Sequence, residues 1–148
     1  MTSIFDPDTF MDQEVSEGNS TERLLCPPGV YSASVEEVKF SNGEKEGKEW
    51  VMMSLKWSID DPSVLSELKR DKVTVRQSFF IDLTEDGGIS TEKGSNVQLG
   101  KVRKALGLNE GRFSPRMLMG QMALVEVVHR AQKDGTLSDE VKSVASLG

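Results

Sequence analysis

Residues 50–59 read WVMMSLKWSI and carry the clearest strand pattern in the chain. Every odd position from Val51 to Ile59 is apolar, whereas Ser54, Lys56 and Ser58 alternate with them. Successive side chains of a β-strand point to opposite faces, so this period of two predicts a strand with one buried face.

On the N-terminal side, residues 30–40 follow the same period through Val35 and then change parity at Val38. One extra residue in a strand produces such a change, so we expect a strand with a β-bulge near Glu36-Glu37. Residues 41–48 are polar and contain two glycines, which predicts a hairpin loop.

On the C-terminal side, the chain alternates between helix and strand signals. A proline is tolerated at the first helical position, so Asp61-Pro62 predicts a short connecting helix. Asn96 or Ser95 can cap a longer helix that ends near Gly107. Further elements are a strand over 73–83, a short turn from Ser114-Pro115 to Gly120, and strands over 122–130 and 138–144.

The expected order is therefore β-β-β-α-β-β, with one main helix between the third and fourth strands. This is the order of the OB-fold, a five-stranded, partly open Greek-key barrel. We expect a mainly β protein of this class, while other small β-rich folds with one helix remain open.

The acidic residues are unevenly distributed. The 148 residues carry a net charge of −6, and residues 1–22 hold six of the 24 acidic residues and no Lys or Arg. The rest of the chain is then neutral, with 18 acidic and 18 basic residues. We expect a flexible acidic tail over 1–24 and one OB-fold domain over 25–148, whose surface can still carry a basic face.

Cysteine and apolar content set the expected compartment. Cys26 is the only cysteine, so a disulfide framework is excluded and a reducing cytoplasm is expected. The chain shows neither a secretory signal pattern nor an apolar run near the roughly 20 residues that span a bilayer, so we expect no membrane partner.

Catalytic motifs are weak in this sequence. His129 is the only histidine, which is too few for a His-based zinc site, and neither a Walker loop nor a dinucleotide glycine fingerprint is present. Carboxylates such as Asp82 and Asp86 sit where turn and cap residues are common. We therefore expect a protein that is not an enzyme and needs no cofactor, and a carboxylate-based nuclease ranks as a third hypothesis.

The outward side of the second and third strands carries the most informative pattern. Large apolar rings and cations alternate there, and bases stack on aromatic rings while Lys and Arg neutralise phosphates. The candidate DNA-binding residues are Lys39, Lys48, Trp50, Met52, Lys56, Lys72, Arg76, Phe80 and Arg130.

Two other interpretations of exposed residues stay open. The aromatic patch of Trp50 and Phe80 can also pack under the tail or form a subunit interface, since exposed apolar patches mark protein contacts as well. Lys101 and Lys104 either extend a basic track or are simply solvated on the outer side of their helix.

With these elements, the chain resembles phage-encoded single-stranded DNA-binding proteins that adopt OB-folds. The similar segments are IFDP at 4–7, GVYSA at 29–33, FIDLT at 80–84 and FSPR at 113–116 leading to Gly120. The resemblance implies sequence-nonspecific coating of single-stranded DNA during replication or recombination of viral DNA, in the host cytoplasm.

The resemblance also concerns partners. Many such proteins recruit replication or recombination proteins through an acidic C-terminal segment, whereas here the acidic residues lie in the N-terminal tail. We expect the tail to take that role or to compete with DNA. The alternative function is a protein-interaction or virion assembly component that forms a homo-oligomer through the aromatic patch.

Overall fold

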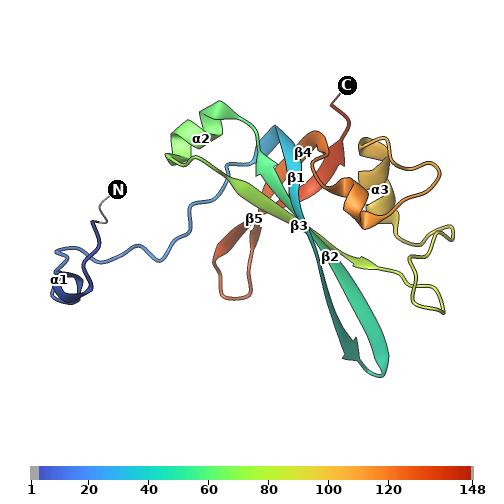
Figure 1. Cartoon of the computed structure of the whole chain (residues 1–148), viewed down its shortest axis with the longest axis horizontal. Coiled ribbons are helices and arrows are strands. Elements are labelled where there is room, and N and C mark those ends of the chain that lie inside the picture. Colours follow the sequence, from blue (N-terminus) through green and yellow to red (C-terminus); the bar gives the residue numbers. More distant parts are fainter. Residues whose placement is uncertain (1–3, 148) are drawn as a thin grey trace.

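The computed structural model describes residues 4–147, which form a curved antiparallel sheet, helices at its margins and an N-terminal arm (Figure 1). The strands occur in the order β3-β2-β1-β4-β5. They are β1 (Gly29–Lys45), β2 (Lys48–Ile59), β3 (Thr74–Ile81), β4 (Met122–Ala131) and β5 (Leu137–Ala145). The helices are α1 (Pro7–Met11), α2 (Pro62–Leu68), α3 (Val97–Ala105) and the 3₁₀ helix η1 (Pro115–Leu118). The predicted mainly β class, with a helix between β3 and β4, is confirmed.

The hairpin of β1 and β2 is longer than its sequence suggests. The register passes from Val35 opposite Trp57 to Glu37 opposite Lys56, so the predicted bulge is confirmed. The predicted loop over 41–48 is wrong, because pairing continues until only Glu46 and Gly47 make the turn. Both turn residues have positive φ, as a type I′ hairpin requires. The polar residues of this region reflect an exposed hairpin rather than a loop.

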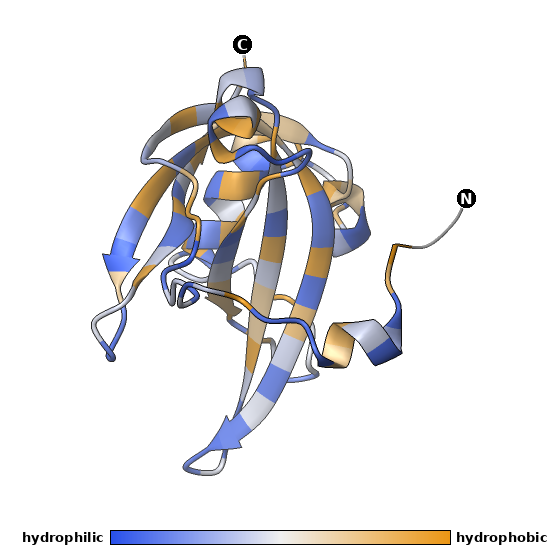
Figure 2. Ribbon diagram, turned by 90° about the vertical axis from the view of Figure 1, so that its left-hand side faces the viewer, coloured by the Kyte–Doolittle hydropathy of each residue, from blue (hydrophilic) through white to orange (hydrophobic). Residues whose placement is uncertain are grey.

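The core lies inside the curved sheet. Figure 2 shows alternating hydrophobic and hydrophilic bands along the long strands, as the period of two predicts. Trp57 is fully buried at 0% exposure, and its Nε1 donates a hydrogen bond of 3.0 Å to Oε1 of Gln77. This bond explains how a glutamine occupies an inward position on β3, because a buried polar group needs a partner.

The sheet is not closed into a barrel by backbone hydrogen bonds. It curls until β3 and β5 approach each other, yet within residues 4–147 no ladder joins these two edge strands. The expectation of a barrel must therefore be corrected to an open, curled sheet. Pairing would require a strand separation of about 4.8 Å, whereas here α3 contacts both strands and a cleft separates them.

Asn96 attaches the start of α3 to the end of β3. It caps the helix in the left-handed conformation, with a φ of 49°, but its side chain makes no cap hydrogen bond. The side chain instead bonds to the backbone of Asp82 and Ser90, with distances of 2.6–2.9 Å. The backbone N–H of Asn96 also donates to Oδ2 of Asp82 at 2.8 Å. The position of α3 therefore depends on contacts with the β3 end.

The N-terminal arm leads away from the sheet and contains α1 (Figure 1). Residues 4–24 are exposed, and the rings of Phe5 and Phe10 meet edge to face at 5.0 Å. Burial begins at Cys26, whose N–H donates to Oδ2 of Asp139 at 2.8 Å. None of the helices in the described part of the chain has the length and apolar character needed to span a bilayer.

Candidate nucleic-acid interface

The convex side of β1, β2 and β3 presents an ordered grid of side chains, which we call the outer face. Antiparallel registers place residues of the three strands in rows. The rows are Glu37–Lys56–Arg76, Lys39–Ser54–Ser78 and Ser41–Met52–Phe80, followed by the pair Gly43–Trp50. Cations therefore gather at one end of the outer face and apolar groups at the other.

The apolar end is built around Trp50. Its ring meets the ring of Phe80 edge to face, with centroids 6.1 Å apart and planes at 90°. The indole lies over Gly43 of β1, where an added Cβ would come within 2.5 Å of the ring. Phe80 is 66% exposed, which is high for such a large apolar side chain. This end offers two aromatic rings to a flat partner.

The cationic end contains one carboxylate among three cations. Glu37 pairs with Lys39 at 3.0 Å and with Lys56 at 4.0 Å. The hydrogen bond from Lys39 holds the pKa of Glu37 below its usual range, and the charges of Lys56 and Arg76 act in the same direction. Glu37 is therefore ionised at neutral pH, and this end keeps a net positive charge.

Six of the nine predicted binding residues share the outer face. Lys48 and Lys72 lie at its margins, whereas Arg130 lies on β4 and lines the cleft between β3, α3 and β5. Lys48 lies toward the hairpin tip, two residues before Trp50 on the same side of β2. Lys72 precedes β3 and forms an ion pair with Glu36, the bulge residue. Arg130 of β4 forms an ion pair of 2.6 Å with Glu140 of β5. These internal ion pairs lower the charge that Lys72 and Arg130 can offer to a ligand.

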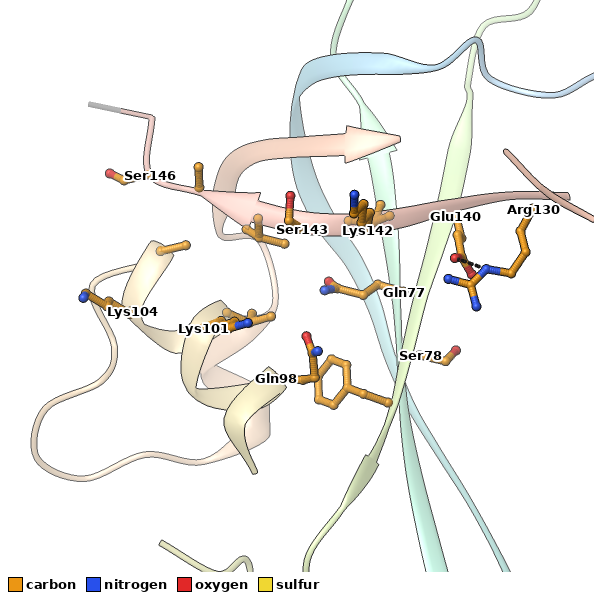
Figure 3. Close-up of a pocket in the computed structure, with 16 residues that line it drawn as sticks. Gln77, Ser78, Gln98, Lys101, Lys104, Arg130, Glu140, Lys142, Ser143 and Ser146 are labelled. Carbon is orange, nitrogen blue, oxygen red and sulfur yellow. Dashed lines mark ion pairs between the residues drawn. The ribbon is translucent and has the colours of Figure 1, made fainter. Parts of the chain in front are cut away.

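A second polar site lies in the cleft between β3, α3 and β5, which has a volume of about 840 Å³. Figure 3 shows Lys101 and Lys104 on α3, Lys142 on β5, and Gln77 on β3 around the same space. From the sequence, Lys101 and Lys104 either extend a basic track or are solvated, and Lys142 is not singled out. These residues line one cleft because the sheet curls, which no local sequence pattern predicts.

The remaining chemically active side chains have structural contacts. Nε2 of His129 donates to the carbonyl oxygen of Cys26 at 2.8 Å, and Asp61 accepts from the N–H of Ser63 at the start of α2. Within residues 4–147, no three His, Cys, Asp or Glu side chains are grouped in a way that could hold a metal ion. The carboxylate of Asp82 accepts a hydrogen bond from the backbone N–H of Asn96.

Comparison of the chain with models of known protein families and with curated proteins finds no match. The geometry of the outer face and of the cleft is therefore the basis on which a function can be proposed for this chain.

Proposed function

We propose that this chain is a single-stranded DNA-binding protein with an OB-type fold, acting without sequence preference in viral DNA replication or recombination. The observation that carries the proposal is the outer face, where Trp50 and Phe80 lie beside a net positive cluster. Bases stack on aromatic rings for about 1–3 kcal/mol each whatever their sequence, and cations contact the phosphates between them. The strand order also supports an OB-type assignment, because it corresponds to such a barrel opened between β3 and β5.

Trp50 provides the direct test of stacking. Single-stranded DNA should quench tryptophan emission, because Trp50 is partly exposed whereas Trp57 is fully buried. Trp50→Ala should weaken binding by about tenfold or more, the equivalent of 1.4 kcal/mol or above. Trp50→Phe is the matched control, because it keeps a ring for stacking while removing the indole emission. Equal affinity of Trp50→Ala and the wild type would contradict the stacking role.

Arg76 tests the phosphate contacts. It is exposed and has no ion pair with a carboxylate in the described part of the chain. Arg76→Ala should lower the affinity and reduce the salt dependence of binding by about 0.7 in the log–log slope. If the wild-type protein shows no salt-sensitive binding to an oligonucleotide of about 15 nucleotides, the proposed function is wrong. Parallel RNA titrations report the preference between the two polymers.

The second candidate function is assembly through protein contacts. Exposed aromatic residues on both the outer face and the arm, such as Phe80, Phe5 and Phe10, favour it. Sedimentation without DNA separates the two functions: concentration-dependent association that is lost in Phe80→Ser, together with no DNA binding, would favour assembly.

A further inference from the structure

The cleft between β3, α3 and β5 opens where the sheet lacks a closing ladder. Its walls come from elements that are distant in sequence: Gln77 and Ser78 of β3, Gln98 and Lys101 of α3, and Lys142 of β5. With a volume of about 840 Å³, it is large enough to hold more than one nucleotide-sized group. It is also distinct from the aromatic end of the outer face.

The cleft concentrates unpaired positive charge in a chain of net charge −6. Lys101, Lys104 and Lys142 all line it, and in the described residues none of them forms an ion pair. Lys39 and Lys72, on and beside the outer face, are paired with glutamates. The cleft also contains one ion pair, between Arg130 and Glu140, which leaves the three lysines as its unpaired charges. Like charges that line one cleft attract counter-ions, and an anionic ligand relieves their repulsion.

Neutral hydrogen-bonding groups accompany these cations. Gln77 is only 6% exposed, and its Oε1 is engaged by the indole of Trp57. Because that bond orients the amide, the NH₂ group of Gln77 remains as the donor directed toward the cleft. Gln98 points into the same space from α3 (Figure 3). Such groups suit phosphate oxygens or base edges rather than an apolar ligand.

The cleft is continuous with the outer face through Ser78. This residue belongs to the middle row of the outer face and also lines the cleft. Phe80 follows two residues later on the same side of β3, which is about 7 Å away along the strand. A strand stacked on Phe80 therefore reaches the cleft by following β3 toward Ser78.

We propose that the cleft is a second subsite for single-stranded DNA, in which Lys101, Lys104 and Lys142 bind the phosphodiester backbone after it leaves the outer face. This inference rests on the proposed function and extends it from stacking at one face to a path around the edge of the sheet. It predicts that oligonucleotide length decides whether the cleft lysines matter, because a short ligand is held by the outer face alone.

The test compares two triple variants of the full chain on oligonucleotides of about 6 and about 15 nucleotides, within the range of site sizes for one OB domain. The cleft variant is Lys101→Gln/Lys104→Gln/Lys142→Gln. The control, Arg23→Gln/Lys69→Gln/Arg70→Gln, removes the same charge from exposed positions that line neither the outer face nor the cleft. Circular dichroism melting verifies that both variants fold.

On the longer oligonucleotide, the cleft variant should bind at least tenfold more weakly than the control at low salt. Its log–log salt slope should fall by about 2, or about 0.7 for each lysine. On the shorter oligonucleotide, the two variants should bind alike. In the wild type, the longer ligand alone should protect Lys101, Lys104 and Lys142 from acetylation.

The outcomes separate the two proposals. If the wild type binds both oligonucleotides but the cleft variant and the control share one salt slope, the subsite is wrong and the proposed function stands. If the longer oligonucleotide does not reduce acetylation of the three lysines, the proposed subsite is likewise wrong. If the wild type binds neither oligonucleotide, both the proposed function and the subsite are wrong.

Discussion

At the scale of single residues, what surrounds a side chain matters more than its chemical type. Gly43 is a clear case, because its missing side chain leaves room for the indole of Trp50 on the neighbouring strand. Cys26 is another, since the only thiol of the chain is 1% exposed and lies against the β4–β5 hairpin. The surroundings of Gly43 and Cys26 therefore predict how each position responds to substitution or to a thiol reagent.

Gly43→Ala should impair DNA binding although Gly43 itself has no group to bind DNA. The added Cβ would come within 2.5 Å of the Trp50 ring, so the ring must leave its position against Phe80. We expect weaker oligonucleotide binding and a shifted tryptophan emission, with folding retained. Gly100→Ala is the control, because an added Cβ there meets no heavy atom within 4 Å. Unchanged emission in Gly43→Ala would contradict the role of Gly43 in making room for the Trp50 ring.

Cys26 should be inert toward thiol reagents in the folded protein. Burial raises the pKa of its thiol from 9.0 to about 11, and the charge of Asp139 adds to the shift. Reaction with an aromatic disulfide at pH 8 should therefore be slow until urea unfolds the chain. As the pH rises from about 9 to about 11, the unfolded thiol ionises first, so this group then disfavours folding. Rapid reaction of the native protein at pH 8 would show that the thiol is accessible.

At the scale of elements, the contacts between β3 and α3 decide whether the cleft exists. The side chain of Asn96 makes three hydrogen bonds to the backbone of residues 82 and 90. No helix propensity accounts for them, because they join the end of a strand to the start of a helix. The cleft lysines of α3 are positioned by this junction.

Asn96→Gly should destabilise the fold by about 1–3 kcal/mol, since each bond contributes about 0.5–1.5 kcal/mol and compensation is partial. Glycine tolerates the positive φ at this position, so the change isolates the loss of the side chain. Urea unfolding gives the free energy, and Asn109→Gly provides the control at an exposed asparagine outside the regular elements. If the two variants were equally stable, the Asn96 contacts would not hold α3 in place.

At the scale of the whole molecule, charge is divided between an acidic arm and a body that is neutral overall. The arm holds six carboxylates and is exposed, whereas the outer face and the cleft carry the cations proposed to bind DNA. A tethered acidic segment repels phosphates within a Debye length, about 10 Å at 0.1 M salt, and competes for the same cations.

Replacing the six acidic residues of 1–22 with Asn and Gln should therefore raise the affinity for single-stranded DNA. The gain should be largest near 50 mM salt and shrink toward about 200 mM, as screening removes the effect of the arm. The midpoint of thermal unfolding should not change, because residues 4–22 are exposed. Equal affinities at low salt would show that the arm is electrostatically remote from the DNA path.

Local sequence patterns were enough to predict the strands, the main helix, the bulge and the aromatic members of the outer face. These follow from local rules, because the period of two, the glycine and proline positions and the capping residues act over a few neighbouring residues. The length of the β1–β2 hairpin was missed for the same reason, since polar residues at an exposed tip resemble a loop.

Three other features arise from long-range packing: the open edge between β3 and β5, the pairing of Lys72 with Glu36, and the placement of Lys101, Lys104 and Lys142 along one cleft. Each of these features depends on how far the sheet curls and on where α3 packs. Each therefore involves residues that lie far apart in the sequence. Side-chain alternation determines which face a residue occupies but not which distant residue it will meet.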